Sequence, residues 1–265
     1  MNITDFRKMK ASSQKISMIV CYDHWSAQIV NQSKVDCILV GDSAAMVIHG
    51  HNTTLPATVD MMIQHIQAVA KGAPQKFIVG DMPFCSYRKG LTDTMETVDK
   101  MMKAGSHAIK LEGADDNASI ITHIVKSGIP VMGHIGLTPQ SVHSLGGFKV
   151  QGRQQDAADR ILEQALTLQD AGCFSLVLEC IPYELAKRIS AELTIPTIGI
   201  GAGPYTDGQV LVLQDMLGLQ THKPKFLKTF MEGFSLIKTT LDQYDNEVKS
   251  STFPTINEHS YEHSV

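Results

Sequence analysis

Short runs of apolar and β-branched residues recur along the chain, and longer segments of mixed polarity separate them. Runs of near-continuous hydrophobicity are typical of strands in parallel sheets that are covered on both faces. The pattern therefore predicts eight strands, at Ile16–Tyr22, Cys37–Asp42, Phe77–Asp81, Ala108–Glu112, Pro130–His134, Phe174–Cys180, Pro196–Gly201 and Gln209–Leu213.

The segments between these runs carry helix signals. Ala104-Gly105, Ser127-Gly128 and Ala171-Gly172 are expected helix ends, and Asp93-x-x-Glu96 resembles a capping box at a helix start. The repeating unit along the chain is therefore a strand followed by a helix. Eight such units in one domain favour a closed (βα)8 TIM barrel of the α/β class over an open, doubly wound sheet, which the same period also allows.

The length and composition fit one main domain. A chain of 265 residues with 43% hydrophobic content can form a sizeable core, and α/β barrels often have this size. The residues after about 250 are mostly polar, which is typical of a loosely ordered end. We expect a single barrel domain over residues 1–250 and a polar C-terminal tail over residues 251–265.

Charge and cysteine usage argue against several classes of function. The formal net charge is −4 and no basic block occurs, so nucleic acid is not the expected ligand. The five cysteines form no CxxC pair, which fits a reducing compartment. No apolar stretch approaches the roughly 20 residues of a membrane span, and the N-terminus lacks the apolar core of a signal peptide. We expect a cytoplasmic protein that binds neither membranes nor nucleic acid.

Acidic residues stand at the ends of four predicted strands: Asp42, Asp81, Glu112 and Glu179. Because the carboxyl ends of barrel strands meet at one mouth, we expect these side chains to converge. Clustered carboxylates raise each other's pKa unless a cation neutralises them, and all-oxygen ligation suits Mg²⁺ or Mn²⁺ better than zinc. For any single acid, the alternative is a helix cap or a partner for a lysine.

Two charged residues have distinct expected roles. Lys110 lies two residues before Glu112, so both point to the same face of their strand. Lys110 either binds a substrate carboxylate or pairs with Asp81 or Glu112. Glu179 lies across the barrel from Asp42, which suits a general base with a raised pKa better than a metal ligand, with a helix cap as the alternative.

Three weaker signals accompany these residues. Ser43 directly follows Asp42 and offers a hydroxyl and a backbone N–H to a small anion. His134 either hydrogen-bonds a ligand or is a satisfied histidine of the barrel. The glycines between Gly199 and Gly203 follow a late strand with no long helix after them, so they indicate close approach to a ligand or another strand instead of a dinucleotide site.

Longer motifs occur in a fixed order between about Ile16 and Phe226, and they closely resemble those of the ketopantoate hydroxymethyltransferase family. They are Val40-Gly41-Asp42-Ser43, His51-Asn52-Thr53-Thr54-Leu55-Pro56, Gly133-His134-Ile135-Gly136-Leu137-Thr138-Pro139-Gln140-Ser141-Val142, Gly146-Gly147-Phe148-Lys149-Val150-Gln151-Gly152, and Gly199-Ile200-Gly201-Ala202-Gly203 with Asp207-Gly208-Gln209. Motifs of this length and order are far more specific than an isolated glycine pattern.

The resemblance implies a (βα)8 barrel of the phosphoenolpyruvate and pyruvate superfamily, assembled as a homodecamer. It implies Mg²⁺ ligation by Asp42 and Asp81, with Glu112 in or next to that shell, and proton abstraction by the catalytic residue Glu179. The substrate contacts that it implies are Asp42, Ser43, Asp81 and Lys110. These positions coincide with those chosen from the strand ends.

The resemblance also implies a reaction in pantothenate and coenzyme A synthesis. A hydroxymethyl group passes from the co-substrate 5,10-methylenetetrahydrofolate to 3-methyl-2-oxobutanoate by Mg²⁺-assisted enolisation and aldol-type addition, giving 2-dehydropantoate. One alternative is a Mg²⁺-dependent carbon–carbon lyase that acts on a 2-oxo acid without folate. Another is a non-catalytic barrel that binds a metabolite, although such a protein has no physical need for clustered charges.

Overall fold

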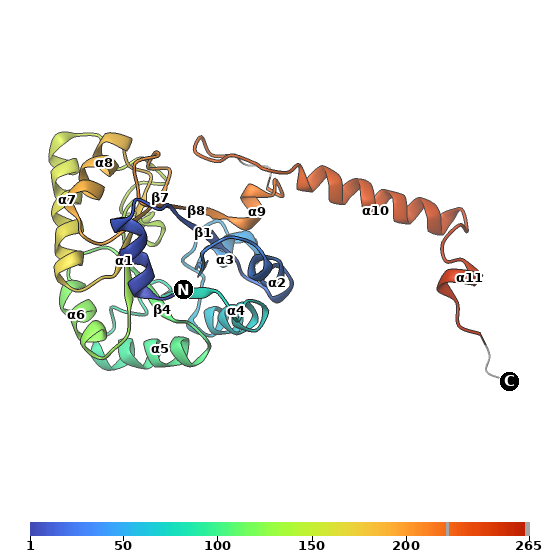
Figure 1. The fold of residues 1–265 in the computed structure, drawn as a ribbon, viewed down its shortest axis with the longest axis horizontal. Helices are drawn as coiled ribbons and strands as arrows, with labels where there is room; N and C mark the ends of the chain where they lie inside the picture. Colours follow the sequence, from blue (N-terminus) through green and yellow to red (C-terminus); the bar gives the residue numbers. More distant parts are fainter. Residues whose placement is uncertain (221–222, 263–265) are drawn as a thin grey trace. The chain divides into compact units, whose positions relative to one another are not determined.

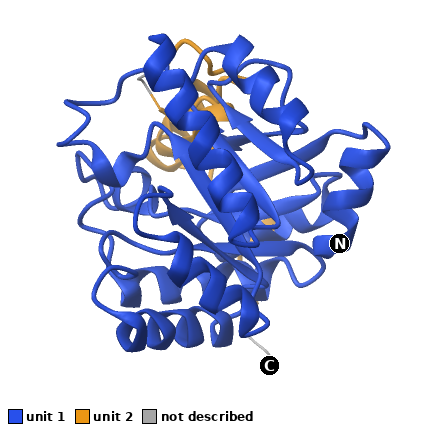
Figure 2. Cartoon of the chain, turned by 90° about the vertical axis from the view of Figure 1, so that its left-hand side faces the viewer, with its two compact units in different colours: residues 1–213 blue, residues 214–265 orange. Residues whose placement is uncertain are grey.

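The chain forms two compact units in the computed structural model, residues 1–213 and residues 214–265 (Figure 1, Figure 2). The structure describes residues 1–220 and 223–262. All eight strands belong to the first unit, whereas α10 (Gly233–Lys249) and α11 (Ile256–His259) belong to the second. The domain boundary expected at residue 250 stays a prediction, and residues 263–265 of the expected tail lie outside the described residues.

Eight parallel strands close into a barrel in the order of the sequence, so the predicted fold class is confirmed. Every strand begins and ends within two residues of its predicted bounds. The strands are β1 (Ile16–Val20), β2 (Cys37–Val40), β3 (Phe77–Asp81), β4 (Ala108–Glu112), β5 (Val131–Gly136), β6 (Ser175–Glu179), β7 (Thr197–Ile200) and β8 (Gly208–Val212).

Helices follow most of the strands. They are α2 (His24–Gln32), α3 (Ala44–Val47), α4 (Val59–Gly72), α5 (Leu91–Lys103), α6 (Ala118–Lys126), the 3₁₀ turn η1 (Pro139–Ser141), α7 (Gln155–Asp170), α8 (Tyr183–Glu192) and α9 (Leu213–Met216). The predicted helix ends at Ala104, Ser127 and Ala171 are confirmed as C-caps. The predicted capping box is wrong, because α5 begins after Gly90 and has no side-chain cap.

The connection from β7 to β8 departs from the predicted period, because residues 201–207 contain no helix. This segment packs directly on the outside of β7. A Cβ atom on Gly199 would lie 2.7 Å from Thr206 Oγ1, so only glycine permits the approach. Gly199 thus lets the side chain of Thr206 pack closely on β7, whereas the sequence predicted an approach of backbone to a ligand or another strand.

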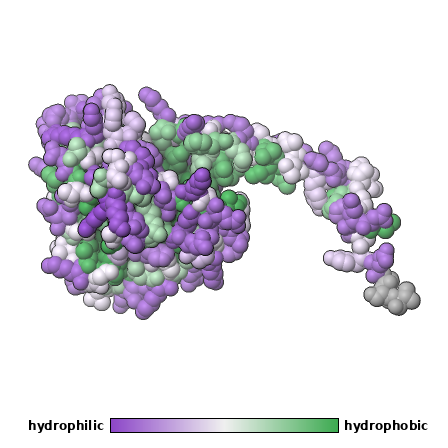
Figure 3. Space-filling model, in the orientation of Figure 1, coloured by the Kyte–Doolittle hydropathy of each residue, from purple (hydrophilic) through white to green (hydrophobic). Residues whose placement is uncertain are grey.

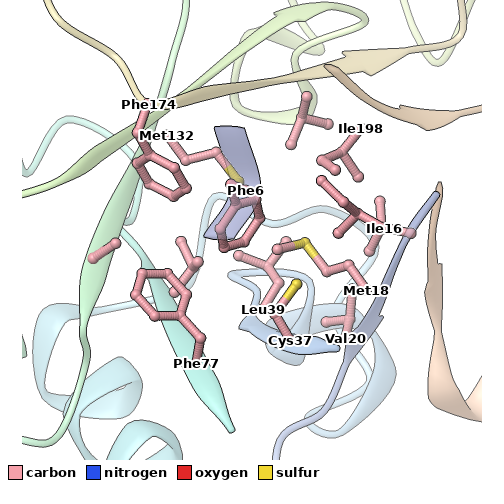
Figure 4. Close-up of a cluster of buried hydrophobic side chains, with 14 of the residues drawn as sticks. Phe6, Ile16, Met18, Val20, Cys37, Leu39, Phe77, Met132, Phe174 and Ile198 are labelled. Carbon is pink, nitrogen blue, oxygen red and sulfur yellow. The ribbon is translucent and has the colours of Figure 1, made fainter. Parts of the chain in front are cut away.

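Helix α1 (Ile3–Ala11) closes the end of the barrel where the strands begin. Phe6 is 0% exposed, and its ring centroid lies 5.5 Å from that of Phe77 and 5.1 Å from that of Phe174. Phe77 opens β3 and Phe174 directly precedes β6. Figure 4 shows Phe6 among the apolar side chains of this core. The apolar core therefore fills the end of the barrel where the strands begin, and polar groups lie at the end where the strands finish.

The second unit exposes large apolar side chains around and along α10 (Figure 3). They are Phe230, Met231, Phe234, Leu236, Ile237, Leu241, Tyr244 and Val248. Contiguous exposed apolar residues are typical of interaction surfaces. None of the helices in the described part of the chain has the length and apolar character that crossing a bilayer requires.

Candidate active site

The strand register brings the predicted residues together. Asp81 of β3 is the partner of Lys110 on β4, and Glu112 of β4 is the partner of His134 on β5. A cavity of about 110 Å³ at the carboxyl ends of the strands is lined by every residue that the sequence singled out for chemistry: Asp42, Ser43, Asp81, Lys110, Glu112, His134 and Glu179. The expected convergence at one mouth is confirmed.

Lys110 is buried and forms an ion pair with Asp81. Its Nζ lies 2.6 Å from Asp81 Oδ1 and 3.7 Å from Glu112 Oε1. Burial alone would lower the pKa of Lys110, but the charges of Asp81, Glu112 and Asp42 raise it above its ordinary value. Lys110 is therefore a fixed positive charge on the cavity wall.

Asp42 is the acid of the cluster whose negative charge is raised in energy by its acidic neighbours. Its backbone N–H donates to Asp81 Oδ2 at 3.1 Å, and its Oδ2 accepts a hydrogen bond of 2.9 Å from Gln140 Nε2. Burial, followed by the negative charges of Asp81 and Glu112, raises the pKa of Asp42 well above its ordinary value. The cluster therefore lacks positive charge at Asp42.

Both oxygens of Glu112 are engaged by the protein. Oε2 accepts a hydrogen bond of 3.0 Å from the backbone N–H of Gln140, and Oε1 lies 3.2 Å from His134 Nδ1. Burial alone would raise the pKa of Glu112, but the charge and hydrogen bond of His134, together with the charge of Lys110, lower it. Glu112 therefore remains ionised and is held firmly in place.

His134 connects Glu112 to Glu179. Its Nε2 lies 3.2 Å from Glu179 Oε2, an ion-pair distance, although the ring is not aligned for a hydrogen bond. Burial and the charge of Lys110 act to lower the pKa of His134, but Glu112 and Glu179 outweigh them and raise it to about 9. At neutral pH the ring is thus an imidazolium between two carboxylates. The contact of Nδ1 with Glu112 agrees with the interpretation of His134 as a satisfied histidine of the barrel, but the sequence did not identify its carboxylate partners.

Gln140 and Tyr87 complete the network and were missed by the sequence analysis. Gln140 Nε2 donates to Met82 O at 2.9 Å, and Gln140 Oε1 accepts a hydrogen bond of 2.7 Å from Tyr87 Oη. A backbone carbonyl only accepts, so this contact fixes the amide with its nitrogen toward Asp42. Gln140 lies within a recognised motif, but a single glutamine in a turn carries no chemical pattern that would reveal its contacts.

Thr54 contributes an unpaired hydroxyl to the cavity wall. Its side chain is 1% exposed, and Oγ1 has no hydrogen-bond partner among the residues that the structure describes. A buried hydroxyl without a partner lowers stability, because it has lost its hydrogen bonds to water. Thr54 Oγ1 is therefore available to a ligand in the cavity.

The cavity has a polar side and an apolar side. The charged residues come from the ends of β2 to β6, whereas the side formed by β7, β8 and β1 presents Ile200, Val210, Val212 and Val20. Apolar lining with a few convergent polar groups is typical of small-molecule sites. The cavity suits a small molecule with an anionic end and an apolar end.

The donor chemistry of the cavity fits a hard divalent cation. Four carboxyl groups face only Lys110 and His134 as positive partners. Among residues 1–220 and 223–262, no three His, Cys, Asp or Glu side chains form a ready-made metal group. Mg²⁺ typically takes only one or two carboxylates, together with water and ligand oxygens. The adjacent carboxyl groups of Asp42 and Asp81 fit that requirement.

The raised pKa of His134 has a consequence for stability. Its folded value of about 9 exceeds the ordinary unfolded value of about 6.5, so the folded state binds the proton more tightly. The stabilisation is fully present below about pH 6.5 and is lost as pH rises through about 9, up to about 3 kcal/mol in all. We expect urea unfolding in metal-free buffer to show this fall, and His134→Gln to flatten it. An equal fall in both proteins would contradict the assignment.

The whole chain resembles one family of sequences. The model of the family described as ketopantoate hydroxymethyltransferase matches residues 1–256. A 3-methyl-2-oxobutanoate hydroxymethyltransferase of Coxiella burnetii (strain CbuG_Q212) is 62% identical over 98% of this chain and 99% of that protein. Proteins of the same name are 61% identical in Bdellovibrio bacteriovorus (96% and 97% covered) and 54% identical in Francisella tularensis subsp. novicida (99% and 99%).

Solved structures show the same fold at low sequence identity. Phosphoenolpyruvate phosphomutase from Streptomyces platensis subsp. rosaceus has a TM-score of 0.65 at 12% identity, with 99% of this chain and 92% of that chain covered. A 2,3-dimethylmalate lyase of the PEP mutase/isocitrate lyase superfamily has a TM-score of 0.60 at 14% identity, with 98% and 91% covered. The fold is that of these barrels, and the sequence match is specific: the chain belongs to the ketopantoate hydroxymethyltransferase family.

Proposed function

We propose that this protein transfers a hydroxymethyl group from 5,10-methylenetetrahydrofolate to 3-methyl-2-oxobutanoate, giving 2-dehydropantoate for pantothenate and coenzyme A synthesis. The shared name of relatives that are 54% to 62% identical over nearly the whole chain supports the acceptor and the transferred group. The observation that carries the proposal is the two-sided cavity, because its polar and apolar walls match the two ends of this 2-oxo acid.

The two walls of the cavity support one orientation of the 2-oxo acid. Its carboxylate and keto oxygens face Lys110 and Ser43, and its two methyl groups face Val210 and Val212 on the apolar side. Carbon C3 joins these two halves of the molecule. Glu179 stands at the end of β6, where the polar side meets the apolar side, which supports its role as the base that acts on C3.

Asp42 and Asp81 are the residues that hold Mg²⁺ in this proposal, with Glu112 next to them. The contacts of Glu112 with His134 and Gln140 support this secondary position, because both of its oxygens are already engaged. When bound, the cation supplies positive charge close to the keto oxygen, which becomes negative as C3 loses its proton.

Glu179 accepts the proton from C3. Its side chain is 19% exposed, and its Oε2 lies beside the His134 imidazolium, which keeps the carboxylate oriented toward the cavity. Water adds to the methylene carbon of the donor and its two C–N bonds break, so the one-carbon unit is released as formaldehyde and the nitrogens of tetrahydrofolate take up protons. The C3–H electron pair moves into the enolate, whose C3 bonds to the formaldehyde carbon, while the C=O π pair becomes an alkoxide that takes up a proton to give the hydroxymethyl group.

Assembly and location form part of the same proposal. The protein works in the cytoplasm as a homodecamer, with neither nucleic acid nor membrane as a partner. The exposed apolar residues of α10, such as Leu236, Ile237 and Leu241, support self-association, because a solitary soluble chain gains nothing from exposing them.

The role of Glu179 is tested by deuterium exchange. Proton NMR follows the loss of the C3 proton of 3-methyl-2-oxobutanoate in D₂O with Mg²⁺ and without folate. We expect Glu179→Gln to slow exchange by about 10²- to 10⁴-fold, because general-base catalysis contributes that much. Glu184→Gln, on the exposed first turn of α8, is the matched control and should exchange normally. Undiminished exchange by Glu179→Gln would mean that another group is the base.

Removing the unpaired hydroxyl of Thr54 should leave stability unchanged or raise it, and should weaken binding of the 2-oxo acid. Thr54→Val keeps the shape of the side chain and removes Oγ1. The free protein should be equally or more stable, since a buried unpaired group disappears, while KM for the 2-oxo acid should rise about tenfold. Thermal unfolding and steady-state kinetics measure the two effects, with the half-buried neighbour Thr53→Val as control. A normal KM with lower stability would show a purely structural hydroxyl.

A further inference from the structure

A second cavity lies beside the reactive cavity, and the proposed chemistry leaves it without a role. It has a volume of about 350 Å³ and is enclosed by the segments that follow β3, β4 and β5 and by one side of α7. Glu112 lines both cavities. Pro139 lines the reactive cavity, and its neighbour Gln140 lines the second one. The two cavities therefore share a wall on the mouth side of the barrel.

The sizes of the two substrates favour different cavities for the 2-oxo acid and for the body of the folate. A space of about 110 Å³ accommodates a small 2-oxo acid. A tetrahydrofolate consists of a bicyclic pterin, an aryl ring and a glutamate, and it is several times larger. Its body must therefore lie outside the reactive cavity, in a space that adjoins it. The second cavity meets this condition, since cavities of a few hundred cubic ångströms are typical ligand sites.

Two arginines of the second cavity have no anionic partner. Arg88 and Arg160 both line it, and neither guanidinium makes a hydrogen bond or ion pair with a residue in the described part of the chain. All three side chains are exposed, but Arg188 pairs with Asp159 at 2.8 Å. Guanidinium groups bind carboxylates in a bidentate manner, so two unpaired arginines in one cavity favour a ligand that carries carboxylates.

The acidic groups of the second cavity offset only part of this positive charge. Glu112 is paired with His134 and held by the backbone of Gln140, so its charge is compensated outside the second cavity. Asp115, which accepts hydrogen bonds of 3.2 Å and 3.3 Å from the neutral amide of Gln164, keeps its charge and offsets one of the two arginines. The cavity also has apolar surface for a ring. Phe84 is 46% exposed, and Tyr87 lies beneath Arg88, whose Cζ is 5.5 Å from the centre of the tyrosine ring.

We propose that the second cavity binds the p-aminobenzoylglutamate arm of the folate donor. The aryl ring packs on the apolar surface near Phe84, and the glutamate carboxylates pair with Arg88 and Arg160. The one-carbon end then extends past the edge of the shared wall at Glu112 and Gln140 to the mouth of the reactive cavity. This inference rests on the proposed function, because it takes the donor to be a folate.

Arginine variants test the cavity by their effect on donor affinity. Arg88→Ala and Arg160→Ala should each raise KM for 5,10-methylenetetrahydrofolate about three- to tenfold, as expected for partly exposed ion pairs, and the double variant should raise it further. KM for the 2-oxo acid and the folate-independent exchange at C3 should not change. Arg153→Ala is the matched control, because this exposed arginine lines a different groove.

Binding of a fragment of the folate donor tests this site independently of the proposed reaction. Calorimetry with N-(4-aminobenzoyl)-L-glutamate needs no turnover, and we expect binding to the wild-type chain that the double variant loses. Unsubstituted 4-aminobenzoate, which lacks the glutamate, should bind more weakly. Fragment binding that survives in the double variant, or a donor KM within about twofold of wild type, would overturn the site. A wild-type chain that binds the fragment but forms no product would overturn the proposed reaction and leave the site standing.

Discussion

Repulsion among buried carboxylates is the constraint on which the site depends. Asp42, Asp81, Glu112 and Glu179 reach one small cavity where water screens them poorly. Lys110 offsets part of this charge at Asp81, and the His134 imidazolium offsets part of it between Glu112 and Glu179. The raised pKa of Asp42 shows where compensation is still missing. A divalent cation beside Asp42 and Asp81 would complete the balance, so the same charges that destabilise the free barrel provide its chemistry.

The barrel makes this arrangement possible because its apolar core and its polar cavity lie at opposite ends. Phe6 of α1 and the aromatic residues at the strand starts form an apolar core at one end. The parallel register then carries polar groups to the opposite end, where Glu112 meets His134 across neighbouring strands. The sides of the cavity divide by strand, with charges on β2 to β6 and apolar residues on β7, β8 and β1. A substrate with one polar and one apolar end is oriented by the fold itself.

Sequence patterns located the strands and the acids because both follow from local rules. A buried parallel strand has an apolar run as its sequence, and an acid at its end faces the mouth, so the sequence alone predicts the positions of Asp81 and Glu179. No local rule predicts the roles of Gln140 and Thr54. Gln140 matters because it donates to Asp42, and Thr54 matters because its buried hydroxyl has no partner in the described residues, and both facts depend on the three-dimensional structure. The start of α5 was mispredicted at Asp93 because an acid in the first turn resembles a cap, whereas Gly90 precedes the helix.

The most direct test of this account is the effect of Mg²⁺ on thermal stability in the wild-type chain and in Asp42→Asn. Without metal, Asp42→Asn should be at least as stable as wild type, because one repelling carboxyl group is gone. With Mg²⁺ at a hundred times its Kd, wild type should gain about 2.7 kcal/mol and a higher Tm, and the variant should gain little. Equal stabilisation of both proteins, or none of either, would contradict the claim that the carboxylate cluster is built for a cation.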